Sequence, residues 1–256
     1  MKVAIYGQYY QNSTEPIIRD IFVFFNDNHV EMVIEEAFLK LLYEKEIVKK
    51  EYKTFQSHTE LDASFDIMIS IGGDGTILRA ATLVRDSGIP ILGVNAGRLG
   101  FLAMVQKDEI AEFLQLIIEK KYTISERNLI SLKGTPDIPE ISDINFAMNE
   151  ISVSRKDTTS MITIETYLND EFLNSYWADG LIVATPSGST AYSLSCGGPI
   201  ITPGCQVHIL TPIAPHNLNV RPMVVPDHMP IKLSIEGRNR TYLMALDGIS
   251  TVIRQQ

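Results

Sequence analysis

The chain has 256 residues, of which 45% are hydrophobic and 21% are charged, an ordinary globular composition with enough length for one large domain or two moderate ones. Its formal net charge of −9 argues against nucleic acid or an anionic membrane as the main partner. Two cysteines do not suggest a disulfide framework. The first residues are typical of a strand rather than of a signal peptide, and no apolar run has membrane-spanning length. We therefore expect a cytoplasmic protein.

The first half of the sequence alternates strands and helices. We expect strands at residues 3–6, 30–34, 65–71 and 89–95, and helices from Thr14 onward, at 35–46, at 77–84 and at about 107–120. Apolar strands separated by helices predict a parallel sheet covered on both faces. Residues 1–105 are therefore predicted to form a Rossmann-like α/β domain, in which ligands bind at the carboxyl ends of the strands.

Short β-rich segments divided by turn residues make up the second half. They lie at residues 123–132, 150–155, 161–168, 171–176, 181–185, 207–210, 223–225, 231–235 and 241–246. This pattern predicts a second domain, residues 106–256, built as a sandwich of antiparallel sheets and entered through the short helix at about 107–120. Residues 133–144 contain two prolines and three acids and are expected to form a surface loop.

The most informative motif is Gly72-Gly73-Asp74-Gly75-Thr76, which lies between an apolar strand and a helix. Its glycines allow a tight turn close to a bulky anion, and the helix N-terminus offers free N–H groups to phosphate. A carboxylate in such a turn repels anions, so Asp74 indicates another task, which is to position an attacking hydroxyl or to accept its proton. The motif predicts phosphoryl transfer.

Further polar motifs lie in the second half. Residues 185–198, TPSGSTAYSLSCGG, suit a loop-to-helix entry that binds a sugar or phosphate, and alone they equally suit a capped surface helix. Asn149-Glu150 can receive the edges of a purine or the hydroxyls of a ribose, although the dipeptide is also common turn chemistry. Asp179-Gly180 and Asp247-Gly248 alone indicate turns.

Together these motifs resemble those of the NAD kinases in order and spacing. The set comprises GGDGT at 72–76, GRLGFL at 97–102, Asn149-Glu150, ADG at 178–180 and the segment 185–198, and the resemblance extends from Met1 to about Gly248. The glycine–aspartate turn alone is shared with diacylglycerol, sphingosine and phosphofructokinase relatives. The combination of Asn149-Glu150 with the segment 185–198 is far more specific and favours the NAD kinases.

The resemblance implies transfer of the γ-phosphoryl group of ATP, with Mg²⁺, to the 2′-hydroxyl of the adenosine ribose of NAD, with polyphosphate as an alternative donor. It assigns Asp74 to that hydroxyl. It assigns to nucleotide binding Gly72, Gly73, Gly75, Thr76, Phe101, Asn149, Glu150, Asp179, Ser187, Thr190, Ala191, Tyr192, Ser195, Ala214, His216 and Asp247. Ala214-Pro215-His216 resembles a stretch that enters the neighbouring subunit's site, which implies a homodimer or homotetramer. The five histidines lack metal-ligand spacing, so no protein-side metal cluster is expected.

Other interpretations stay open on the residues. A kinase of the same fold that acts on a lipid or sugar phosphate would show an apolar entrance or a basic patch, which the negative charge disfavours. A non-catalytic NAD(P)-binding regulator would lack the carboxylate that Asp74 supplies. A Rossmann dehydrogenase is disfavoured because no Gly-x-Gly-x-x-Gly follows the first strand. Members of the resembled family usually continue beyond the region of Asp247 with a segment that packs back on the fold, and this sequence ends at Gln256.

Overall fold

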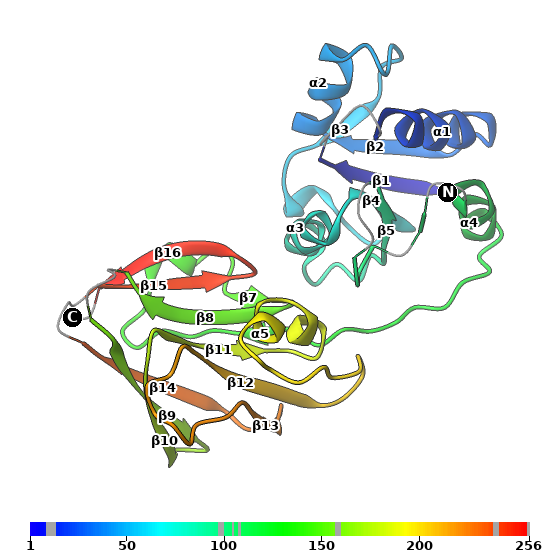
Figure 1. Cartoon of the computed structure of the whole chain (residues 1–256). Helices are drawn as coiled ribbons and strands as arrows, with labels where there is room; N and C mark the ends of the chain where they lie inside the picture. The colour runs from blue at the N-terminus through cyan, green and yellow to red at the C-terminus, as the bar shows by residue number, and fades with distance from the viewer. Residues whose placement is uncertain are drawn as a thin grey trace. The chain divides into compact units, whose positions relative to one another are not determined.

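The computed structural model describes residues 1–8, 14–96, 100–103, 105–106, 109–156, 160–237 and 241–254. The chain forms two compact units, Met1–Ser125 and Glu126–Gln256, each with cores of its own (Figure 1). The junction lies later in the chain than the boundary expected at 105/106, so the connecting helix belongs to the first unit. Within the described ranges, no helix is both long and apolar enough to cross a membrane.

The first unit is a five-stranded parallel sheet, as predicted, with strand order β3-β2-β1-β4-β5 (Figure 1). The strands are β1 Lys2–Gly7, β2 Glu31–Glu35, β3 Lys53–Phe55, β4 Ile67–Gly72 and β5 Ile91–Asn95. The helices are α1 Thr14–Asp27, α2 Glu36–Glu44, α3 Asp74–Val84 and α4 Ile110–Ile118, with a 3-10 turn at η1 His58–Glu60. The strand order reverses between β1 and β4, and ligands of such sheets bind at the carboxyl ends of the strands beside this reversal.

Helices cover both faces of this sheet. Side chains of α1, α2 and α4 share one core with Ile69 of β4, and Ala80 and Val84 of α3 pack in a separate core with Met68. Successive strand residues point to opposite faces, so Met68 and Ile69 enter different cores. Every residue of β4 is buried, which explains its continuous apolar sequence. The turn that follows β4 therefore starts from a strand held on both sides.

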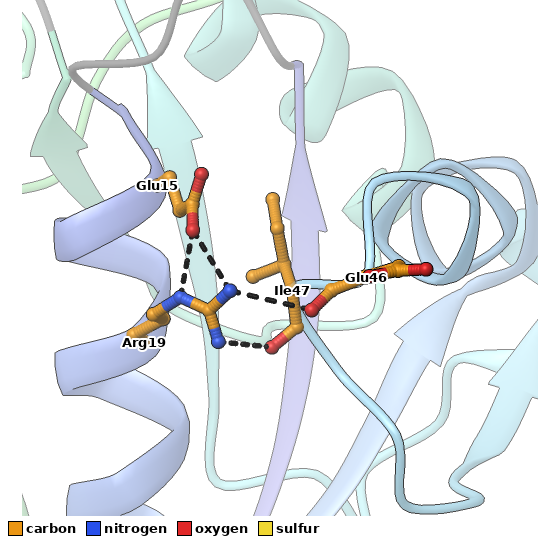
Figure 2. Close-up of polar contacts among 4 residues, drawn as sticks. All are labelled: Glu15, Arg19, Glu46 and Ile47. Atoms are coloured by element: carbon orange, nitrogen blue, oxygen red, sulfur yellow. Dashed lines mark hydrogen bonds and ion pairs between the residues drawn. The ribbon is translucent and has the colours of Figure 1, made fainter.

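Arg19 joins α1 to the segment that leaves α2 (Figure 2). Its Nε donates to Glu15 Oε1 at 2.8 Å, and its Nη1 and Nη2 donate to the carbonyls of Ile47 at 2.9 Å and Glu46 at 3.3 Å. Glu46 has a positive φ of 56°, where the backbone turns away from the helix. Carbonyls near a helix C-terminus lack helical partners, and a guanidinium supplies several donors in one rigid plane. One side chain thus holds two helical segments of the same face together.

The second unit contains antiparallel sheets, as predicted. Their orders are β13-β12-β11-β8-β15-β16, β10-β9-β14 and β6-β7. The strands are β6 Ile130–Ser131, β7 Phe146–Ala147, β8 Glu150–Arg155, β9 Ile162–Leu168, β10 Glu171–Ala178, β11 Gly180–Ala184, β12 Val207–Ile213, β13 Met223–Pro226, β14 Ile231–Glu236, β15 Thr241–Leu246 and β16 Ile249–Arg254. Val153, Leu181 and Tyr242 of the largest sheet share a core with Ile164 and Tyr176 of the three-stranded sheet.

Some elements differ from the sequence-based expectation. The strand expected at 123–132 is wrong over most of its length, because only Ile130–Ser131 pairs and the rest carries the junction between the units. Strands β3, β7 and β16 are not among those expected from the sequence; β3 is short, with only Phe55 buried. The helix expected at about 107–120 is α4, and Lys107 and Asp108 lie outside the described residues. The loop expected at 133–144 contains one 3-10 turn, η3 Pro139–Ile141.

Candidate functional site

The GGDGT segment joins β4 to α3. Gly72 ends the strand with φ +157°, and a Cβ there would lie 2.1 Å from Thr76 Oγ1, so a side chain does not fit. Gly73 precedes the helix and Asp74 begins it. Among the described residues, a Cβ on Gly73 or Gly75 would meet nothing within 4 Å. These two glycines therefore leave open space beside the first turn of α3, where backbone N–H groups and the helix dipole favour an anion.

The carboxylate of Asp74 is enclosed by the segment that follows β5. Its Oδ2 accepts the N–H of Phe101 at 2.8 Å, and its Oδ1 accepts those of Leu102 and Ala103 at 3.0 Å each. A Cβ on Gly100 would lie 2.2 Å from Oδ1. A carboxylate offers about four acceptor positions. Within the described residues, three of these positions accept backbone N–H groups, and the fourth, on Oδ2, is left for a hydroxyl or another donor.

Backbone contacts hold this segment against the turn. The Ala96 N–H donates to the Gly72 carbonyl at 3.2 Å, and the Asn95 N–H donates to the Val105 carbonyl at 2.8 Å. The side chain of Phe101 is 60% exposed, so its ring is available to a ligand. Gly97, Arg98 and Leu99, which complete the GRLG part of the motif, lie outside the described residues.

In the second unit, Asn149 and Glu150 meet Asp247, which lies in the turn between β15 and β16. Asp247 Oδ2 accepts the N–H of Met148 at 2.7 Å, and Oδ1 accepts those of Asn149 at 2.7 Å and Glu150 at 3.1 Å. The Asp247 N–H in turn donates to the Glu150 carbonyl at 3.1 Å. The structure thus brings together two motifs that the sequence offered separately.

Two side-chain oxygens of this cluster are buried without a hydrogen-bond partner among the described residues: Asn149 Oδ1 and Glu150 Oε2. A buried polar atom left without a hydrogen bond lowers the free energy of unfolding by about 1–3 kcal/mol. Glu150 is only 8% exposed. Burial, reinforced by the charge of Asp247, raises the pKa of Glu150 to about 7, and the backbone N–H of Tyr192 opposes the shift. Burial also raises the pKa of Asp247, against its three N–H donors. A ligand with two donors would satisfy both oxygens.

The segment 185–198 forms two short helical turns, η4 Ser187–Thr190 and α5 Tyr192–Ser195. Many of its hydroxyls hold the segment itself: Thr185 Oγ1 accepts the Gly188 N–H at 3.2 Å, Ser189 Oγ donates to the Pro186 carbonyl at 2.7 Å, and Thr190 Oγ1 donates to the Ser187 carbonyl at 3.2 Å. A Cβ on Gly188 would lie 2.1 Å from the Asn149 carbonyl oxygen, so the segment packs directly on the Asn149 backbone.

The outward side of this segment is formed by its later residues. Tyr192 is 44% exposed and Ser195 is exposed, whereas Ser187 is buried and Thr190 and Ala191 are partly buried. Burial raises the pKa of Tyr192, with smaller contributions from Cys196 and from the nearby charges of Asp179 and Glu150. Tyr192 therefore lies close to both carboxylates.

The remaining predicted residues have partners that the sequence analysis did not single out. Asp179 Oδ2 pairs with Arg155 Nη2 at 2.9 Å. Ala214, at φ +44°, and His216 are exposed after β12, and the His216 ring contacts the Trp177 ring in a tilted arrangement with centroids 4.5 Å apart. Nothing in the sequence marks Arg155. Trp177 is the chain's one tryptophan. It is 48% exposed on β10, and an exposed tryptophan on a strand indicates a contact surface.

No group of three or more His, Cys, Asp or Glu side chains is placed to hold a metal ion in the part of the chain that the structure describes. Mg²⁺ prefers oxygen ligands and is often bound through one or two carboxylates together with substrate phosphates. The Asp74 turn fits that arrangement, because the described residues leave one acceptor position of its carboxylate without a partner and the space beside Gly73 and Gly75 open.

Comparison with known proteins identifies the family. The model of the ATP-NAD kinase N-terminal domain matches residues 3–122, and that of the ATP-NAD kinase C-terminal domain matches residues 148–256. The chain is 66% identical over 253 residues to an NAD kinase of Flavobacterium johnsoniae, covering 98% of this chain and 86% of that protein. It is 44% identical over 254 residues to an NAD kinase of Cytophaga hutchinsonii, covering 99% of this chain and 86% of that protein.

Solved structures resemble this chain as well. Yeast NADH kinase complexed with NADH has the same fold, with a TM-score of 0.83 at 24% identity over 98% of this chain and 74% of that chain. An NAD kinase from Archaeoglobus fulgidus in complex with ATP gives a TM-score of 0.75 at 26% identity. The match covers 98% of this chain and 86% of that chain. The family models and the close relatives agree along nearly the whole length: this chain belongs to the NAD kinase family.

Proposed function

We propose that this protein is an NAD kinase that transfers the γ-phosphoryl group of ATP to the 2′-hydroxyl of the adenosine ribose of NAD and so produces NADP. The observation that carries the proposal is the Asp74 carboxylate, which is fixed by three backbone N–H groups and keeps one acceptor position beside an open glycine turn. Relatives named NAD kinase support the acceptor, and the A. fulgidus NAD kinase in complex with ATP supports the donor.

Asp74 acts on the hydroxyl in this mechanism. Its remaining Oδ2 position accepts a hydrogen bond from the 2′-hydroxyl and fixes the line of attack on the phosphorus. A ribose hydroxyl is a weak acid, so the carboxylate takes the proton late, as the new O–P bond forms. The three N–H donors prevent the carboxylate from rotating. Acid–base catalysis of this kind contributes about 10²–10⁴-fold to the rate.

The first turn of α3 receives phosphate. Gly72, Gly73, Gly75 and Thr76 form this turn, and the open space at Gly73 and Gly75 admits an anion close to the backbone. Phosphates of ATP, or of polyphosphate as the alternative donor, present the same chemistry to it. Mg²⁺ bound to the donor's oxygens would neutralise their charge during transfer.

Asn149 and Glu150 bind the adenosine part of NAD. Their two buried oxygens without partners are suited to accept from the adenine amino group or from ribose hydroxyls. Tyr192 supplies a flat aromatic face next to Glu150. The other nucleotide-binding assignments, which rest on the resemblance, are Phe101, Asp179, Ser187, Thr190, Ala191 and Ser195.

A homodimer or homotetramer in the cytoplasm belongs to the same proposal. In the segment assigned to a neighbouring subunit's site, Ala214 and His216 are exposed, and Leu218 nearby is 89% exposed. An apolar residue so exposed near the ring contact between Trp177 and His216 supports a protein interface at this position.

The test is NADP formation by the purified protein, read with a coupled NADP-specific dehydrogenase while NAD, ATP and Mg²⁺ are omitted in turn. We expect turnover that requires all three components. Phosphorylation of a lipid or sugar phosphate but not of NAD would replace the proposed acceptor. Binding of NAD without any turnover, measured by calorimetry, would instead identify a non-catalytic NAD-binding regulator.

A further inference from the structure

Asp247 lies in a tight hairpin turn. Leu246 pairs with Ile249, and Asp247 and Gly248 between them have φ values of 47° and 81°. Two positive φ values in a two-residue loop define a type I′ turn, for which Asp-Gly is a favoured sequence. The turn alone explains the Asp-Gly pair. It does not explain why the carboxylate points to another strand.

That carboxylate binds three consecutive backbone N–H groups, of Met148, Asn149 and Glu150, from positions 97 to 99 residues earlier in the chain. Charge-assisted hydrogen bonds of this type are stronger than neutral ones. Two bonds end on Oδ1 and one on Oδ2, so both oxygens are needed. The contact fixes the backbone where the buried oxygens of Asn149 and Glu150 emerge.

We propose that Asp247 is a positioning residue for NAD: it sets the Asn149–Glu150 pair through the backbone, an inference that rests on the proposed function. The resemblance alone placed Asp247 among the binding residues. The geometry gives it a positioning role, because both oxygens of its carboxylate bind the backbone N–H groups that lead into the Asn149–Glu150 pair.

The carboxylate also acts on Glu150 through its charge. The proximity of Asp247 is the second cause, after burial, of the raised Glu150 pKa, and the backbone N–H of Tyr192, itself titratable, donates to Glu150 and opposes the shift. Loss of the Asp247 charge should therefore lower the pKa of Glu150. A residue that only stabilised the turn would leave this titration in place.

The test compares Asp247→Asn with Asp170→Asn in the full chain. Asparagine suits a type I′ turn, but its amide NH₂ cannot accept the N–H that the second carboxylate oxygen now accepts. Asp170 is the matched control, because it lies at φ 64° in the turn between β9 and β10 and is exposed. For Asp247→Asn we expect the KM for NAD to rise about tenfold or more, the size of one lost charge-assisted hydrogen bond.

Two further measurements distinguish a positioning role from a general loss of structure or activity. For Asp247→Asn, the KM for ATP should stay within about twofold, and the inflection in the pH profile of kcat/KM for NAD should move to lower pH. Asp170→Asn should match the wild type in all three. An unchanged KM for NAD, a fall in kcat alone, or an equal loss in Asp170→Asn would overturn the inference. A wild type that forms no NADP would overturn the proposed function instead.

A second measurement needs no variant. Hydrogen exchange of the wild-type protein should show the amides of Met148 and Asn149, which precede β8, protected as strongly as those within β8. Exchange of these amides as fast as in the exposed segment near Glu140 would show that the hydrogen bonds to Asp247 do not persist in solution. That result would overturn the inference even if Asp247→Asn failed to fold.

Discussion

Gly100 lies directly against the carboxylate of Asp74. A Cβ on Gly100 would lie 2.2 Å from Oδ1 and 2.4 Å from both Cγ and Oδ2. Real side chains essentially never approach so closely, so the absence of a side chain at position 100 is what allows the backbone to wrap around the carboxylate.

Gly100→Ala should therefore lower kcat by about tenfold or more, because the carboxylate must shift from the line of attack and misplacement by about 1 Å can cost 10²-fold. The control is Gly88→Ala in the same unit, where φ is +74° and a Cβ would meet nothing within 4 Å. That variant should lose about 1 kcal/mol of stability through backbone strain and keep its kcat. Equal kcat values for Gly100→Ala and the wild type would contradict this account of the contact.

The sequence was sufficient for the local elements with strong periodicity. The bounds expected for β8 and β15 match the structure. Burial alternates along β15, and such alternation has a sequence signature, whereas the first four residues of β8 are all buried. The short strand β3 escaped notice, since only Phe55 of its three residues is buried.

The candidate site was predicted residue by residue but not as an arrangement. Asp247 and Glu150 stand 97 positions apart and meet because β15 pairs with β8, with Leu246 opposite Ile151. Sheet register at that distance has no local sequence signal. The donors to Asp74 and Asp247 are backbone N–H groups, which every residue except proline carries. The sequence can therefore name the carboxylates but not what they bind.

The KM for NAD should fall as the pH rises from 6 to 8. Glu150 has a pKa raised to about 7, and hydroxyl donors of a bound ribose favour its ionised form. Binding of NAD should accordingly release a proton, which calorimetry in buffers of different ionisation enthalpy detects. Glu150→Gln should remove the pH dependence, while Glu140→Gln, in the exposed loop before β7, should retain it. A pH-independent KM in the wild type would contradict the assignment of Glu150.

Glu150 should also make stability depend on pH. Its folded-state pKa of about 7 exceeds its ordinary value of 4.5, so the folded state binds the proton more tightly than the unfolded state. The contribution of Glu150 to the free energy of unfolding is therefore fully present below pH 4.5. It is lost as the pH rises through about 7, by up to about 3 kcal/mol.

Glu150→Gln should thus be more stable than the wild type at pH 8, by about 1–3 kcal/mol, and equal to it near pH 4. Urea unfolding followed by fluorescence measures this, because Trp177, the one tryptophan of the chain, lies in the second unit. A variant that is less stable at both pH values would show that Glu150 is held by contacts that favour its charge.

Two inactive variants should restore activity when their subunits are mixed. If His216 acts in a neighbouring subunit's site, an oligomer of Asp74→Asn and His216→Ala subunits contains sites with both Asp74 and His216 intact. Mixing under conditions that exchange subunits should then recover up to about a quarter of the wild-type turnover, the statistical yield in a dimer. Activity no higher than the sum of the separate variants would contradict a shared site.

The most direct test of the account is Asp74→Asn. Asparagine keeps the size of the side chain but removes the negative charge and one acceptor oxygen. We predict that kcat for NADP formation falls by at least about a hundredfold, the lower range for acid–base catalysis. The Kd of NAD by calorimetry should stay within about threefold of the wild-type value, since a threefold change is under 1 kcal/mol. Asp86→Asn, at an exposed position beyond the other end of α3, should behave as the wild type in both measurements. Turnover by Asp74→Asn equal to that of the wild type would contradict the central claim that this carboxylate acts on the hydroxyl.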